Sequence, residues 1–276
     1  MVKELDLGDQ RERLRHPLER RISIAVALVG ALLAAVVLGL LFWGTEWLET
    51  YPSVAKYENH AHLLMLAVLG APVISTWVRR KRWRLAQDDS IRIDATQLPR
   101  LHAMLVSHCQ KVGLAVPALY VSDGIEQTTS FSWRHRNCII LSSQELSRFS
   151  EGFDEIVEFI LAREVGCICL GHTSFGSEFL KSFVARVPFL RAPLDHVRTY
   201  SRDRYGAALA PHALGALLVT VCGDRMLADV HPDAYFAQMS DRSERTLGRT
   251  ALSMFRKRAP LARRIQQLRQ ARLLEE

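Results

Sequence analysis

Residues 163–172 read Arg-Glu-Val-Gly-Cys-Ile-Cys-Leu-Gly-His, and they close a segment with the apolar periodicity of an α-helix. This periodicity predicts a helix over about 152–170 with one face turned inward. The inward stripe comprises Phe153, Ile156, Val157, Ile160, Arg163, Glu164, Cys167 and Ile168. Because charged side chains on an apolar face need partners, we expect Arg163 and Glu164 to be paired inside the protein.

The same stretch has the spacing of an H-E-x-x-H zinc helix. In that motif two histidines at i and i+4 bind the metal, and the glutamate acts as general base. Here Arg163 and Cys167 stand at the two histidine positions, and Glu164 is retained. An arginine has no lone pair to offer and stays protonated, whereas a cysteine thiolate is a good zinc ligand. The motif therefore keeps its base and loses its first ligand.

Two uncharged segments near the amino terminus predict a membrane anchor. Residues 22–45 form an uncharged run longer than the roughly 20 residues that cross a bilayer. A signal peptide is the alternative, but its apolar core would be shorter, and no clear cleavage site follows. Residues 59–78 are also uncharged, although they contain Pro72. We expect a second span there, and the alternative is a buried or re-entrant helix.

The charges beside these segments predict their orientation. Basic residues precede the first segment and follow the second, whereas the connection between them carries glutamates and a single lysine; the basic residues are Arg11, Arg13, Arg15, Arg20 and Arg21, then Arg79, Arg80, Lys81, Arg82 and Arg84. By the positive-inside rule both termini and the main domain are expected on the cytoplasmic side of an inner or plasma membrane. The five cysteines, at irregular spacing, suggest no disulfide framework, which agrees with a reducing compartment.

The chain accordingly divides into four parts. They are a basic cytoplasmic segment (1–21), a two-span anchor (22–78), a basic juxtamembrane linker (79–92) and a cytoplasmic domain (93–276). In the domain, a helix should end before Gly113, and Ser142 with Glu145 has the pattern of a capping box. Strands are predicted over 117–122, 128–133 and 138–142, as a small antiparallel sheet. Further helices, separated by prolines including Pro193, are expected near 175–188, 195–209, 212–222 and 261–273. The predicted class is α+β, mainly helical.

The order of these features resembles the HtpX-like membrane zinc metallopeptidases, the group that includes the prenyl-protein (CAAX) proteases. The family helix reads H-E-x-G-H, often followed by Gly-His, and Gly166, Gly171 and His172 match it. A later family segment, R-x-x-E-Y-x-x-D-R-x-G, supplies a third zinc ligand, a glutamate. Residues 195–206 resemble it, matching at Tyr200, Asp203, Arg204 and Gly206, with Thr199 at the ligand position. A shifted alignment would put Asp203 there instead.

This resemblance covers about residues 20–270 and implies a zincin-like cytoplasmic domain. The ligand positions it assigns are Arg163, Cys167 and Thr199, of which only Cys167 is a good donor, so no metal or other cofactor is expected. Glu164 would be a vestigial general base, and His172, Tyr200 and Asp203 would support the site. We hypothesise that the Arg163 guanidinium takes the place of the metal and pairs with Glu164 or Asp203; alternatively, it extends to solvent. A covalent mechanism through Cys167 would need a base, and Glu164 and His172 are the nearest candidates.

The family resemblance implies that substrate binds as an added strand at a sheet edge, here 128–133 with Thr129, Ser130 and Phe131. Such pairing needs no metal. We therefore predict a membrane-anchored, catalytically inactive pseudoprotease that binds or regulates another protein. The alternative is an active zinc-dependent membrane metalloendopeptidase with an atypical or misaligned ligand set. The basic residues Arg79–Arg84 should contact anionic headgroups. Nucleic acid is not an expected partner, because no reader motif accompanies the charge.

Overall fold

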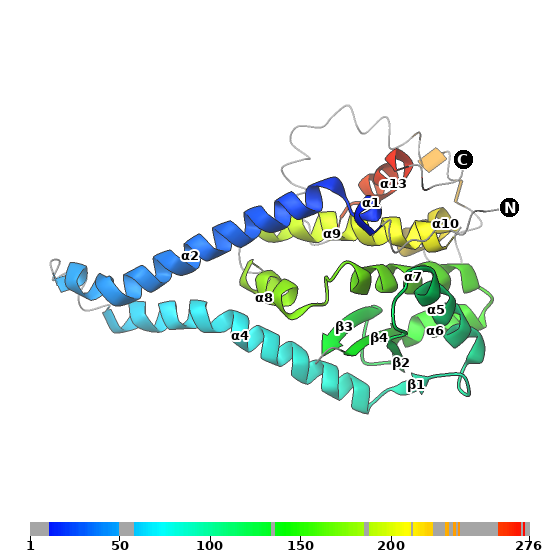
Figure 1. Ribbon diagram of the computed structural model, residues 1–276, viewed down its shortest axis with the longest axis horizontal. Coiled ribbons are helices and arrows are strands. Elements are labelled where there is room, and N and C mark those ends of the chain that lie inside the picture. The colour runs from blue at the N-terminus through cyan, green and yellow to red at the C-terminus, as the bar shows by residue number, and fades with distance from the viewer. Residues whose placement is uncertain are drawn as a thin grey trace.

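The structure is a computed structural model that describes residues 11–49, 58–133, 136–184, 188–210, 212–222, 230–231, 234–235, 237, 259–271 and 273. Most of these residues are helical, and they contain one small sheet, as the predicted α+β class requires (Figure 1). The helices are α1 (Arg11–Leu14), α2 (Pro17–Glu49), α4 (Glu58–Asp88), α5 (Pro99–Lys111), α6 (Ser143–Ser150), α7 (Asp154–Cys169), α8 (Phe175–Val184), α9 (Pro188–Leu209), α10 (Ala213–Cys222) and α13 (Leu261–Gln270). The strands are β1 (Ile91–Ile93), β2 (Ala118–Ser122), β3 (Thr129–Trp133) and β4 (Arg136–Ser142).

The sheet is mixed, which corrects the prediction of an antiparallel sheet. Its strand order is β1-β2-β4-β3, with β2 and β4 parallel and the two outer pairs antiparallel. The five residues Cys138–Ser142 of β4 are all buried. A strand buried in this way belongs in the centre of a sheet, so β4 pairs with a neighbour on each side and β3 is left at the edge. The three-residue β1 was not predicted.

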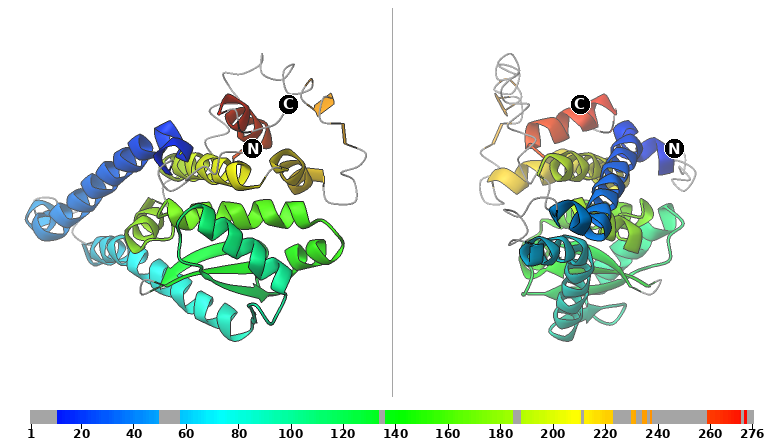
Figure 2. Two further views of the ribbon diagram at one scale, coloured as in Figure 1. Left: turned by 45° about the vertical axis from the view of Figure 1, so that its right-hand side comes forward. Right: turned by 90° about the vertical axis from the view of Figure 1, so that its left-hand side faces the viewer.

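Helix α7 lies between the sheet and α9 (Figures 1 and 2). Since it is covered from both sides, it is buried almost all round, and Phe159, Leu161 and Val165 join the predicted stripe in the core. The prediction of a single inward face was therefore too narrow. Arg163, Glu164 and Cys167 consequently lie in the interior, between two layers, rather than on an open surface.

Helices α7 and α9 approach each other at two glycines. A Cβ atom added at Gly166 would lie 2.4 Å from Cβ of Tyr205, and one added at Gly206 would lie 2.6 Å from Cγ of Arg163. Such distances leave no room for a larger residue at either position. The two glycines thus fix the register at which the residues of α7 face those of α9.

The amino-terminal helix α2 carries the membrane signal. Its segment Pro17–Leu40 is long and apolar enough to cross a bilayer, and little of it is buried in the protein. Large apolar side chains such as Leu28 and Leu32 are about two-thirds exposed, at 66% and 64%. Only the first turns are covered, since Val26 packs against Val184 and Leu194. This segment is the one candidate span among the described helices.

The predicted second span, 59–78, forms the first part of α4, and its crossing of the membrane stays a prediction. Residues 79–88, predicted as a linker, continue the same helix to Asp88. In Figure 1, α2 and α4 converge at the end far from the sheet, and α8 lies between them where they diverge. The basic residues after the second segment are therefore carried on helix α4, close to α8.

Two local predictions need correction. The capping box does not form: Ser142 precedes α6 without a side-chain cap, and Glu145 instead binds Arg148 at 2.7 Å. Pro193 does not separate helices either, because α9 runs from Pro188 through it. Of the predicted amino-terminal segment, residues 1–10 lie outside the described residues.

Candidate functional site

The candidate site is built where α7 faces α9, at the register set by Gly166 and Gly206. Helix α7 contributes Arg163, Glu164 and Cys167, and α9 contributes Arg202 and Asp203. All of these groups are largely buried. Their pairing explains how a core helix can carry an arginine and a glutamate.

The carboxylate of Asp203 is the centre of the first pair of contacts. One oxygen lies 2.8 Å from Nε of Arg163. Arg264 of α13 donates to both oxygens, from Nε at 2.6 Å and from Nη2 at 2.9 Å. Burial would raise the pKa of Asp203, but the two guanidiniums hold it below its usual value. The partner of Arg163 is thus Asp203, not Glu164, and the side chain does not extend to solvent.

Glu164 is held by a separate set of partners. Arg202 forms an ion pair with one oxygen, and Ser130 of β3 donates to the other at 2.8 Å. The residue is 2% exposed, and both of its oxygens already have a partner in the protein.

Cys167 lies one turn further along α7, beside His172. Gly171 adopts a left-handed conformation with φ of 72°. This turn brings the chain back, so that the N–H of His172 donates to the carbonyl of Cys167 at 3.0 Å. Burial would raise the pKa of the Cys167 thiol, but Arg202 and His172 lower it below its usual value.

His172 connects this site to the amino-terminal segment. Its Nε2 lies 2.7 Å from a carboxylate oxygen of Glu19, in the first turn of α2. Ser201 of α9 donates to the other oxygen of Glu19, and it accepts from the N–H of His16 at 2.9 Å. His16 and the first turn of α2 are therefore packed into the interior of the part of the protein that contains α7 and α9.

The two remaining predicted residues lie away from these pairs. The hydroxyl of Thr199 donates to the carbonyl of Asp195, one turn back in its own helix, at 2.7 Å. Tyr200 is buried against the amino-terminal segment, with its ring 5.4 Å from that of His16. The site thus unites Arg163 with Asp203, Glu164 with Ser130 and Cys167 with His172, and it leaves Thr199 outside.

These residues do not fit a zinc ion. Arg163 offers no lone pair, and Thr199 is a poor ligand whose hydroxyl bonds within its own helix. Cys167 alone remains of the three ligand positions. In the part of the chain that the structure describes, no group of three His, Cys, Asp or Glu side chains is arranged to hold a metal ion.

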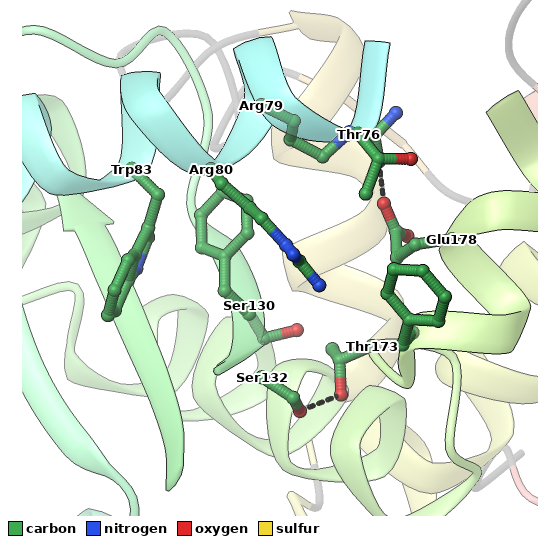
Figure 3. A pocket seen from close by; sticks show the side chains of 10 residues that line it. Thr76, Arg79, Arg80, Trp83, Ser130, Ser132, Thr173 and Glu178 are labelled. Atoms are coloured by element: carbon green, nitrogen blue, oxygen red, sulfur yellow. Dashed lines mark hydrogen bonds and ion pairs between the residues drawn. The ribbon is translucent and has the colours of Figure 1, made fainter. Parts of the chain in front are cut away.

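A pocket of about 40 Å³ lies along β3, between α4 and the start of α8 (Figure 3). Such a volume holds a few water molecules or one small side chain. Trp83 and Phe131 face each other on one side with ring centroids 6.3 Å apart. On the other side Ser132 and Thr173 share a hydrogen bond of 2.5 Å, and Arg80 lies over the ring of Phe175. We call this the edge-strand pocket.

The pocket and the α7–α9 site are adjacent. Ser130 lines the pocket and binds Glu164, while Thr173 lines it one residue after His172. In the described part of the chain β3 pairs only with β4, so Thr129, Ser130 and Phe131 lie in an edge strand, and peptide binding there stays a prediction. Whether a peptide pairs with the other side of β3 is a question of function, taken up below.

Sequence reasoning missed several members of the site: His16, Glu19, Ser201, Arg202 and Arg264. One signal was available. Glu19 is the last carboxylate before the long uncharged segment, although its place in the first turn of α2 and its ion pair with Arg15 at 3.7 Å also favour it there. The contacts of His16 and Ser201 join segments more than 150 residues apart, and those of Arg202 and Arg264 join residues 38 and 61 positions apart. Nothing in the local sequence pattern indicates them.

Compared with protein-family models, curated proteins and solved structures, the chain matches none of them. The class to which it belongs is therefore argued from its own residues and their geometry.

The buried carboxylate should be more important for stability than either arginine. Asp203→Asn leaves two buried guanidiniums without a counter-charge, and we expect it to lower the free energy of unfolding by about 3–5 kcal/mol. Arg163→Met should cost less, because Asp203 keeps its bidentate partner Arg264. Urea unfolding of the purified full-length chain in detergent would measure both.

The matched control is Asp154→Asn. Asp154 pairs with Arg100, whose side chain is 76% exposed, so its loss should cost at most about 1 kcal/mol. The assignment of Asp203 as the central acceptor is wrong if Asp203→Asn destabilises the chain no more than this control does.

Proposed function

We propose that the chain is a membrane-anchored, metallopeptidase-like protein that has no catalytic zinc and that binds an extended protein segment at β3. The observation that carries this proposal is the state of the would-be catalytic residues. Arg163 is neutralised by Asp203, and Glu164 is held by Arg202 and Ser130. Residues placed in this way stabilise a fold, and they leave no group ready to activate water.

The position of Asp203 supports the resemblance to a metallopeptidase. In zinc sites a carboxylate commonly accepts a hydrogen bond from a ligating histidine and orients it. Asp203 stands in this relation to position 163, where the family helix has its first histidine. The register that assigns Thr199 to the third ligand is therefore favoured over the shifted one. Arg163 in place of a histidine keeps the contact with the carboxylate without the metal.

The edge-strand pocket supports the binding role. An edge strand presents unpaired backbone groups that can pair with an extended peptide, and neighbouring pockets select its side chains. Here the pocket beside β3 is lined by aromatic side chains, among them Phe175, which is 59% exposed. The bound segment would thus add a strand to the sheet and place an apolar side chain between Trp83, Phe131 and Phe175.

The membrane orientation is part of the same proposal. Residues 22–45 and 59–78 would both cross the bilayer, and both termini with the main domain would lie in the cytoplasm. The basic residues that flank the two segments support this orientation, since positive charge is retained on the cytoplasmic side. The edge-strand pocket would then lie close to the membrane surface, because Thr76 and Arg79 of α4 line it.

An active zinc peptidase remains the second candidate, favoured by one observation. Arg202 and His172 lower the pKa of the Cys167 thiol, which favours the thiolate form that binds zinc. This candidate requires further ligands from residues outside those discussed above.

Metal analysis separates the two candidates. We expect the purified full-length chain to contain well below one zinc per molecule and to leave casein uncleaved. The triple variant Arg163→His, Cys167→His, Thr199→Glu should take up zinc, because it restores the three family ligands on the same two helices. Near-stoichiometric zinc in the natural chain, lost with a chelator together with casein cleavage, would overturn the proposal.

Peptide binding can be measured with fluorescently labelled, unfolded β-casein, which offers many extended segments. We expect it to bind the full-length chain in detergent without being cleaved. Phe175→Asp should weaken binding about tenfold, because it places a charge in the pocket. Val116→Asp is the matched control, since Val116 is also exposed, at 45%, and does not line the pocket. Equal binding by both variants would contradict a role for the pocket.

The orientation predicts which side of the membrane each segment faces. A cysteine introduced at Ser53, in the connection between the two segments, should react with a membrane-impermeant maleimide added to intact cells. A cysteine introduced at Asp89, after α4, should react only once the cells are permeabilised. Labelling of the Asp89 variant in intact cells would contradict a cytoplasmic main domain.

A further inference from the structure

A second cluster of charges lies where α4, α8 and α9 meet, beyond the α7–α9 site. Arg191 and Asp195 are one turn apart on α9, and Arg198 is the next residue along the same face. The carboxylate of Asp195 has two cationic partners. Nζ of Lys181, on α8, lies 3.3 Å from one oxygen, and Nε of Arg191 lies 3.2 Å from the other. Arg79 of α4 pairs with Glu178 of α8.

The charges of this cluster do not balance. Among the described residues it contains four cations, Arg79, Lys181, Arg191 and Arg198, and two carboxylates, Glu178 and Asp195. Both carboxylates are already paired. At the α7–α9 site three guanidiniums, of Arg163, Arg202 and Arg264, face two carboxylates, and each guanidinium has an ion-pair partner. Positive charge is therefore in excess at this junction.

Among the four cations of this cluster, Arg198 is the one without an ion-pair partner in the described part of the chain. It is 8% exposed, no ion pair is formed by its guanidinium in the described part of the chain, and its buried Nε has no hydrogen-bond partner there. An unpaired buried cation is costly unless a counter-charge is supplied. Burial lowers the pKa of Arg198, although Glu19 and Asp195 act in the opposite direction.

Burial and neighbouring cations also lower the pKa of two other members of the cluster, Arg79 and Lys181. Burial and the neighbouring Arg191 lower the pKa of Arg79. Burial, together with Arg198 and Arg79, lowers the pKa of Lys181 against the effect of Asp195. Their side chains are nevertheless about a third exposed, at 39% for Arg79 and 31% for Lys181. An anion could thus reach the rim of the cluster from outside.

We propose that this junction binds the phosphate group of an anionic phospholipid, with Arg198 at its base and Arg79, Lys181 and Arg191 around it. Arginine and lysine are the side chains that hold phosphate, and a basic pocket between helices at the cytoplasmic surface is where such headgroups bind. Arg79 is the first residue after the predicted second span, so the cluster lies at headgroup level. The proposal rests on the membrane orientation given above and not on peptide binding.

The position of the phosphate site, between three helices, distinguishes it from basic residues that are attracted to a membrane surface in general. Arg80 and Lys81 follow Arg79 on α4, but they lie over the rings of Phe175 and Trp77 respectively. The phosphate site instead draws on three helices and includes a buried residue. It would therefore join α4, α8 and α9 through one bound group, next to the edge-strand pocket, which Arg79 and Glu178 also line.

The test compares the full-length chain in nanodiscs of phosphatidylcholine with the chain in discs that also contain phosphatidylglycerol. We expect phosphatidylglycerol to raise the melting temperature. Arg198→Met should abolish this rise, and in phosphatidylcholine alone it should leave the melting temperature unchanged or higher, because an unpaired cation has been removed. A purely structural arginine would give the opposite result, a loss of stability in both lipids.

Two further arms complete the experiment. Arg20→Gln removes the same charge from an exposed position on the same side of the membrane, and it should keep the response to phosphatidylglycerol. Inorganic phosphate added to phosphatidylcholine discs shows whether the free ion is sufficient. If it raises the melting temperature of the natural chain but not of Arg198→Met, the site binds soluble phosphate. If it leaves the melting temperature unchanged, the site is assigned to the lipid. The proposal is overturned if neither anion stabilises the natural chain, or if Arg198→Met responds as fully as Arg20→Gln.

This outcome can be read separately from peptide binding. Arg198→Met should bind labelled casein as the natural chain does, because Arg198 does not line the edge-strand pocket. Loss of the lipid response with unchanged casein binding identifies the phosphate site alone.

Discussion

The carboxylate of Asp203, fully buried between α7, α9 and α13, is the constraint on which the packing around the sheet and these helices depends. An ionised carboxylate in an apolar interior is costly unless cations and hydrogen bonds surround it. The guanidiniums of Arg163, on α7, and Arg264, on α13, supply the positive charge that this carboxylate requires. The same carboxylate in turn stabilises both guanidiniums in the interior. Moving any one of the three helices would separate charges that have no access to water.

This arrangement has a different character from a metal centre. A zinc ion would hold its ligands by coordination and would keep one position open for water or substrate. Arg264 binds Asp203 through two hydrogen bonds and Arg163 forms an ion pair with it, an arrangement without such an open position. In the same place Glu164 is bound on both oxygens. Both carboxylates thus contribute to the cohesion of the helices around them.

Part of this architecture could be predicted from the sequence. The apolar periodicity around Arg163 located a core helix, and the chemistry of arginine required an acidic partner, which the structure identifies as Asp203. Short strands were also located, including β3 at the sheet edge. The pairing order was not predictable, because the full burial of β4 becomes evident only when its neighbours are known. The prediction for Ser142 failed since Glu145 had a better partner nearby in Arg148. His172 could be named but its role could not, because Glu19 lies 153 residues away.

The contact between Glu19 and His172 also has a consequence for the order in which the protein can mature. Residues 16–19 leave the ribosome long before His172, Ser201 or Gln267 has been synthesised. The interior around α7 and α9 therefore closes around a segment that was made at the start of synthesis. A domain cut free after residue 78 would lack this segment, and its His172 and Ser201 would lose their carboxylate. Closure of this interior is, in this sense, a late step that waits for the carboxyl-terminal helices.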